Sequence, residues 1–152
     1  MPQYNQLELH PCCQQRELLA YMKERGVEAI AYSSLAPLGS WRVLENGTEQ
    51  ESGKARLTDE RKARVMAVID EIKESRGMTD AQVLLRWGLE KGYRILPKSL
   101  NEGRMSANLA VGKMKLESAD VMNLDGLGGG SVGSEMEDVP MAWAFGDPVE
   151  AK

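Results

Sequence analysis

The strongest constraint on the fold is a threefold repetition of a short apolar segment, a polar turn and a helical pattern. The repeats lie at residues 5–11 (NQLELHP), 29–35 (AIAYSSL) and 96–104 (LPKSLNEGR). Strands that alternate with helices indicate an α/β fold with a parallel sheet. In such folds ligands bind where strands end and helices begin. We therefore expect functional residues at these three strand ends.

Helical patterns fill the segments between the expected strands. In the first, residues 14–25, apolar side chains recur at helical spacing, and Gly26 provides a C-terminal stop. Thr79 and Gln82 have the spacing of a capping box. The remaining expected helices cover residues 58–77, 79–92, 102–109 and a short segment from residue 116. A connection of mixed polar residues, 33–57, separates the second strand from the next helix.

Composition excludes several classes of protein. The net charge of −4 gives no electrostatic footprint for nucleic acid, and no apolar run reaches the ~20 residues of a membrane span. The first residues do not have the pattern of a secretion signal. Cys12 and Cys13 are adjacent and predict reduced thiols, and the single histidine, His10, argues against a metal site. We expect a cytoplasmic location, with import into an organelle left open.

The 152 residues divide into two parts of different composition. Residues 1–127 carry the strand and helix patterns of one domain. Residues 128–152 begin with a glycine-rich run, continue through an acidic patch and contain the apolar segment 141–145 with Trp143. We interpret this second part as a flexible linker followed by a docking tail, which either binds a partner or folds back on its own domain.

The third strand end offers the most specific candidate site. Lys98 and Ser99 follow the strand, and Asn101 is placed to cap the next helix. A helix N-terminus favours phosphate, and Arg104 in the first turn could clamp one, with Asn108 on the same face. An ordinary capped surface helix with solvated charges explains these residues equally well.

Gln6 and Tyr32 are expected to end the first two strands. A glutamine amide can pair with a carboxamide, and a tyrosine ring can stack on a flat heterocycle. Taken singly, a buried glutamine and a tyrosine at the edge of the core are the commoner explanation. His10 has no nucleophile motif beside it and is interpreted as a structural histidine in the turn.

The motifs together resemble the aldo-keto reductases. They lie at residues 5–11, 31–35 (AYSSL), 81–87 (AQVLLRW) and 96–99 (LPKS), with Arg104 and Asn108, in the family's order and approximate spacing. The resemblance implies a partial (β/α)8 TIM barrel, with about three β/α units that correspond to strands 6 to 8. It also implies NADP(H) as cofactor.

The resemblance assigns a cofactor contact to each candidate residue. Gln6 would bind the nicotinamide carboxamide and Tyr32 would stack on its ring, while Ser33 and Leu35 would line the pyrophosphate. The adenosine end and its 2′-phosphate would be held by Lys98, Ser99, Asn101, Arg104 and Asn108. Ala36 stands where the family usually has glycine, which predicts an altered pyrophosphate loop.

The family's catalytic residues come from the first half of its barrel, which has no counterpart here, so no catalytic residue is assigned. The chain is interpreted as the NADP(H)-binding half of a carbonyl oxidoreductase, with a non-catalytic structural subunit of a larger assembly as the alternative. A nucleotide-binding module that senses NADPH is a weaker third possibility. Because a partial barrel leaves open strand edges around Leu7 and Ile95 and an uncovered apolar face, we expect a partner that completes the barrel.

Overall fold

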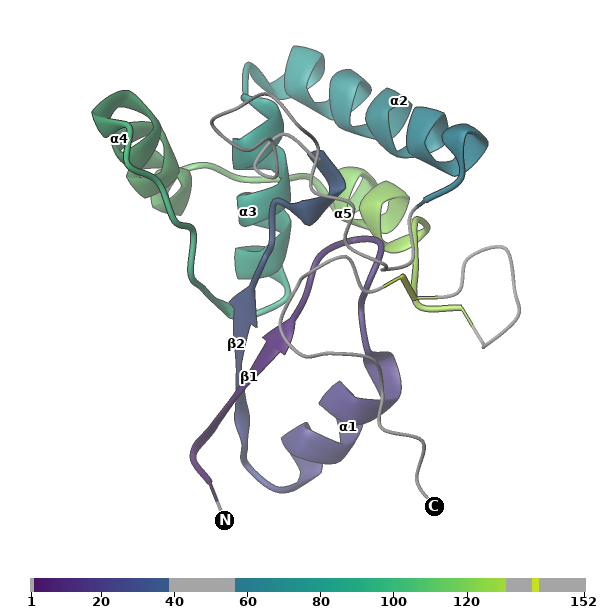
Figure 1. The fold of residues 1–152 in the computed structure, drawn as a ribbon, viewed down its shortest axis with the longest axis vertical. Coiled ribbons are helices and arrows are strands. Elements are labelled where there is room, and N and C mark those ends of the chain that lie inside the picture. The colour runs from purple at the N-terminus through teal and green to yellow at the C-terminus, as the bar shows by residue number, and fades with distance from the viewer. Residues whose placement is uncertain (1, 39–56, 131–137, 140–152) are drawn as a thin grey trace, which may run out of the picture.

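The computed structural model describes residues 2–38, 57–130 and 138–139 (Figure 1). Three strands, β1 (Tyr4–Glu8), β2 (Glu28–Tyr32) and β3 (Arg94–Ile95), form a parallel sheet in the order β1-β2-β3. The predicted alternation of parallel strands with helices is confirmed. β1 and β3 are the outer strands of this sheet, as expected for the segments around Leu7 and Ile95.

Local capping chemistry accounts for where most helices begin. The hydroxyl of Thr58 accepts the Arg61 amide at 3.2 Å, and Thr79 and Gln82 form the predicted capping box. The helical elements are α1 (Arg16–Glu24), η1 (Ala36–Leu38), α2 (Asp59–Arg76), α3 (Asp80–Glu90), α4 (Glu102–Ala110), η3 (Val111–Lys113) and α5 (Ser118–Asp125). α1 starts two residues later than predicted because Gln15 has a left-handed backbone (φ 46°).

The hydrophobic core lies between α2, α3 and α5. Trp87 of α3 is 1% exposed, and its indole nitrogen donates to Asp125 Oδ1 at 2.8 Å. Its ring meets Tyr93 edge to face at a centroid distance of 5.9 Å. The other fully buried members of this cluster are Cys12, Val65, Ile69, Ile72, Val83, Leu84, Leu124 and Leu127.

The two faces of the sheet differ in chemistry. One face is covered by α1, where the Asn5 amide lies 3.6 Å from the sulfur of Met22. On the other face Arg94 lies over the Tyr4 ring at 5.0 Å and pairs with Glu28 at 2.9 Å. The expectation of an apolar open face is therefore wrong at this end of the sheet. Successive side chains of a strand point to opposite faces, and this alternation puts the ion pair of Arg94 and Glu28 on the open face.

Membrane spans and metal sites can be assessed only for the described residues. Within residues 2–38, 57–130 and 138–139, the helices are too short or too polar to cross a bilayer. In the same ranges no three histidine, cysteine or acidic residues gather as metal ligands would. Residues 39–56 of the long connection and the tail segment 141–145 lie outside the described residues.

Candidate functional site

The carboxyl end of the sheet is formed by the last residues of β1 and β2. Tyr32 ends β2 as predicted and lies opposite Glu8 in the parallel register. Gln6 lies in the middle of β1 opposite Ile30, so the prediction that it ends the strand is wrong. The pairing of β1 with β2 continues for two residues beyond Gln6, so Gln6 lies two residue pairs before the pair of Glu8 and Tyr32.

A buried polar pair follows Gln6 at the end of β1. Glu8 is 5% exposed and His10 is fully buried, with 3.1 Å between Glu8 Oε1 and His10 Nε2. Burial lowers the pKa of His10, although the hydrogen bond to Glu8 opposes that shift. Burial raises the pKa of the Tyr32 phenol, and the nearby Glu8 adds to that increase. The structural role predicted for His10 agrees with this environment.

The turn after β2 has an unusual backbone. Ser33 has φ 52°, a left-handed conformation that is uncommon outside glycine, and its carbonyl accepts the Ala36 amide at 2.8 Å. Leu35 packs against the hydrophobic core between α2, α3 and α5. Ser33 therefore directly follows the end of β2, and Leu35 is held in place by its packing against the core.

The start of α4 has the predicted cap. Asn101 Oδ1 accepts the Arg104 amide at 2.9 Å, and the Ser99 hydroxyl accepts the Asn101 amide at 3.1 Å. Lys98 and Arg104 are exposed on either side of this cap, and Asn108 is half-buried one turn further along. These hydrogen bonds order the turn and leave the two cations at the positive end of the helix dipole.

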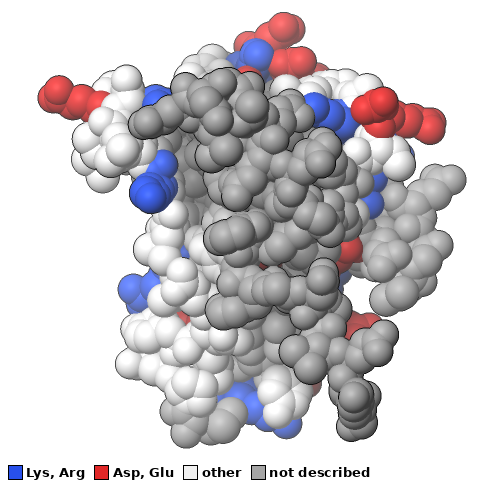
Figure 2. Space-filling model, viewed as in Figure 1, with Lys and Arg blue, Asp and Glu red and all other residues white. Residues whose placement is uncertain are grey.

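The candidate residues form two groups. Gln6, Tyr32 and Ser33 belong to the sheet and its first turn, whereas the residues from 98 to 108 belong to the approach to α4 and to α4 itself. α4 stands at the margin of the molecule, away from α1 (Figure 1). In the view of Figure 2 the charged side chains that can be seen lie mainly around the rim, where both cations and anions are present.

Sequence reasoning missed two acidic residues of this region. Glu8 lies within the first motif, but only the strand register shows that it ends β1 beside Tyr32. Asp138 lies in the tail, and its carboxylate accepts hydrogen bonds from the backbone before α1. No local pattern identifies such a contact, because the partners are more than 120 residues apart.

Comparison with known proteins shows which family has this arrangement. The model of the Aldo/keto reductase family matches residues 2–128. A 4-dihydromethyl-trisporate dehydrogenase of Mucor mucedo is 37% identical over 148 residues, which is 97% of this chain and 42% of that protein. This similarity extends well beyond residue 128 into the tail. A probable NAD(P)H-dependent D-xylose reductase of Emericella nidulans is 35% identical over 80% of this chain and 35% of its own length.

Solved structures give the same result. Gox0644 in its apo form superposes with a TM-score of 0.62 at 30% identity, over 92% of this chain and 44% of that one. A mutant of Gox0644 in complex with NADPH gives a TM-score of 0.61 at 32% identity, over 84% of this chain and 38% of that one. This chain thus spans less than half the length of these relatives, and it belongs to the aldo/keto reductase family.

Proposed function

We propose that this chain is the NADP(H)-binding half of an aldo/keto reductase barrel. The observation that carries the proposal is the capped start of α4, where Lys98 and Arg104 are both exposed beside an N-terminus ordered by Asn101 and Ser99. The helix dipole and two cations suit a phosphate, and the extra phosphate of NADP(H) is the group that distinguishes it from NAD(H).

The sheet would receive the other end of the cofactor. Tyr32 is half-buried at the end of β2, where its ring would stack on nicotinamide. Gln6 is exposed on β1, and Ser33 and Leu35 define the turn that would follow the pyrophosphate. Two relatives support a nicotinamide cofactor: the Gox0644 mutant is in complex with NADPH, and the relative from Emericella nidulans is a probable NAD(P)H-dependent D-xylose reductase.

Titration with NADPH and NADH tests this proposal. We expect NADPH to bind more tightly than NADH, with weak affinity because this chain holds only part of a cofactor cleft. Arg104→Ala should weaken NADPH binding by about 1.5–3 kcal/mol, which is roughly 10- to 150-fold, and should affect NADH much less. Arg64→Ala on the exposed side of α2 is the matched control. Equal affinities for both cofactors, unchanged in Arg104→Ala, would contradict the proposal.

Carbonyl reduction would require catalytic residues in addition to the cofactor-binding residues proposed for this chain. General acid catalysis needs a donor within hydrogen-bond reach of the substrate oxygen, and the family motifs in this chain supply cofactor contacts only. We expect the purified chain to oxidise NADPH at the background rate with a panel of aldehydes. Turnover that a Tyr32→Phe or His10→Asn substitution abolished would show that the site is misassigned.

We further propose that a partner completes the barrel along β3 and α4. Four apolar side chains in this stretch of the chain are exposed: Leu96, Leu100, Met105 and Leu109, which are 51%, 94%, 48% and 84% exposed. The same surface supports a second candidate function, that of a non-catalytic subunit of a larger assembly. Sedimentation of the purified chain tests both, because a stable monomer that unfolds cooperatively would contradict the need for a partner. Assembly that NADPH strengthens favours the reductase.

A further inference from the structure

The tail residue Asp138 occupies a site made of backbone amides. Its Oδ1 accepts the amides of Gln14 and Gly129, each at 2.7 Å, and its Oδ2 accepts the amide of Gln15 at 2.6 Å. Gln14 and Gln15 immediately precede α1, so the carboxylate also lies at the positive end of that helix. Charge-assisted hydrogen bonds of this length are about twice as strong as neutral ones.

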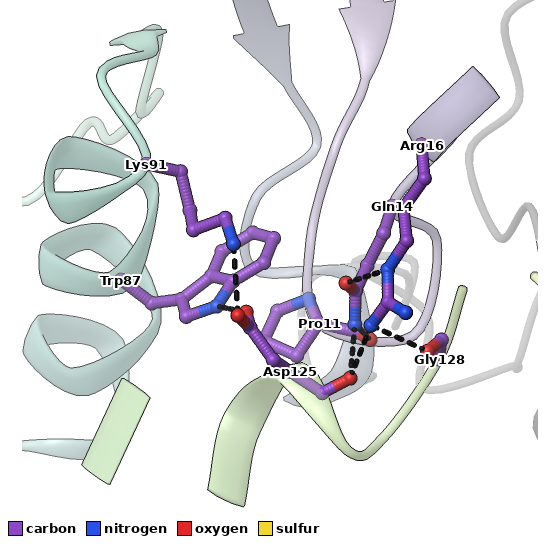
Figure 3. A network of polar contacts seen from close by, with 7 residues as sticks. All are labelled: Pro11, Gln14, Arg16, Trp87, Lys91, Asp125 and Gly128. Carbon is purple, nitrogen blue, oxygen red and sulfur yellow. Dashed lines mark hydrogen bonds and ion pairs between the residues drawn. The ribbon is translucent and has the colours of Figure 1, made fainter. Parts of the chain in front are cut away.

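The backbone that receives Asp138 is itself braced by side chains. Arg16 donates to the carbonyls of Asp125 and Gly128, and the Gln14 amide group donates to those of Pro11 and Asp125 (Figure 3). Gly128 lies so close to Pro11 that a Cβ at this position would overlap the Pro11 carbonyl. The turn before α1 and the segment after α5 are therefore held as one preformed surface.

Gly129 has a second structural requirement at this surface. Its φ of 75° is left-handed, and a side chain there would collide with the Arg16 guanidinium. In this conformation the Gly129 amide donates to Asp138. The glycine-rich sequence after α5 thus has a defined local role at this position.

Two buried thiols lie in the turn that binds these tail residues. Cys12 and Cys13 are free cysteines that are 0% and 1% exposed. Val139, which follows Asp138, donates its amide to the Cys12 carbonyl at 2.8 Å. The pair of residues 138–139 is thus bound by both its side chain and its main chain directly beside the cysteines.

We propose that Asp138 and Val139 form an intramolecular clasp, which docks on the turn of residues 11–15 and keeps Cys12 and Cys13 from reacting with solutes. The occupant of this surface is the chain's own tail. The segment that joins Gly129 to Asp138 is short, so the entropy cost of docking is small. In the docked state the thiols are buried, so thiol reactivity would report opening of the clasp.

Labelling the full chain with iodoacetamide tests the clasp. This reagent is neutral, so removal of a carboxylate does not change its local concentration. It alkylates the thiolate, however, and the charge of Asp138 contributes to the raised pKa of both thiols, so a variant that changes no charge is also needed. Asp138→Ala should increase the labelling rate of Cys12 and Cys13 at least tenfold, and Asp138→Asn should act in the same direction because the charge is lost. Asp70→Asn, a surface carboxylate of α2 that pairs with Lys73, is the matched control and should label like the wild type.

A second variant separates opening of the clasp from general instability. Val139→Pro removes the amide that donates to Cys12 without changing any charge, and it should also accelerate labelling. Global stability is measured by urea unfolding in parallel. Labelling that rises only in proportion to the population of unfolded chain, or that is unchanged in Val139→Pro, would overturn the proposal.

Discussion

Helices α3 and α4 have similar lengths and opposite environments. α3 buries Gln82, Val83, Leu84, Leu85, Trp87 and Gly88, whereas α4 has no buried residue within the described part of the chain. α3 lies among α2, α4, α5 and β3, while the main contacts of α4 are with α3 and η3. Apolar residues of α4 such as Leu109 therefore remain exposed although they follow the same helical spacing. We call the side of α2 and α3, where helices bury their apolar residues, the closed side, and the side of α4, where apolar residues stay exposed, the open side.

The largest expected effect is on the closed side. Trp87→Ala removes a fully buried indole and its hydrogen bond to Asp125, and should lower the free energy of unfolding by about 3–5 kcal/mol. Urea unfolding followed by far-UV circular dichroism measures this loss. A loss below about 1 kcal/mol would mean that the core around α3 is not the stabilising centre of the chain.

Acid should weaken the contact between α2 and α5 on the same side. Burial would raise the pKa of Asp120, but hydrogen bonds from the Arg76 side chain at 2.7 Å and the Glu117 amide outweigh it and hold the pKa below its usual value. A carboxyl with a lowered pKa stabilises the fold above its unfolded pKa and loses that contribution as pH falls through the folded value.

Asp120→Asn tests this pH dependence. The variant should be less stable than the wild type at pH 7, and the difference should shrink below about pH 4, near the ordinary pKa of aspartate. Parallel unfolding curves from pH 7 to pH 3 measure it. A difference that stays constant over this range would assign the effect to packing rather than to the ion pair.

On the open side, the cap of α4 should matter locally. Asn101→Ala removes the acceptor of the Arg104 amide and should cost about 1 kcal/mol of helix stability. Because α4 has few neighbours, hydrogen exchange should accelerate in its first turn and not in α3. Faster exchange spread equally over both helices would show that α4 is part of the closed core.

The smallest effect is expected for Leu109→Ser on α4. This side chain is 84% exposed, so the free energy of unfolding should change by no more than about 0.5 kcal/mol. Self-association or partner binding, measured by sedimentation, should weaken if the open side is an interface. A stability loss comparable to that of Trp87→Ala would remove the distinction between the two helices.

Much of the fold follows from short-range sequence patterns. The capping box of Thr79 and Gln82 and the cap of Asn101 were predicted because each hydrogen bond joins residues three positions apart. Tyr32 was correctly placed at the end of its strand. Gln6 was not, because the end of β1 depends on its pairing with β2 rather than on the polarity of its own residues. The cofactor roles of the candidate residues stay predictions.

The order of strands and helices, most of their caps and the family could be predicted from the amino-acid sequence, because these depend on neighbouring residues and on motifs read in order. Which charged groups are buried or paired depends on the folded arrangement of distant segments. Asp138 accepts a hydrogen bond from the backbone before α1, and Asp125 accepts hydrogen bonds from Trp87 and Lys91. Arg94 pairs with Glu28 on the uncovered face of the sheet. These contacts join residues 34 to 123 positions apart. They form only when burial of the core compensates for the entropy of closing the chain between them.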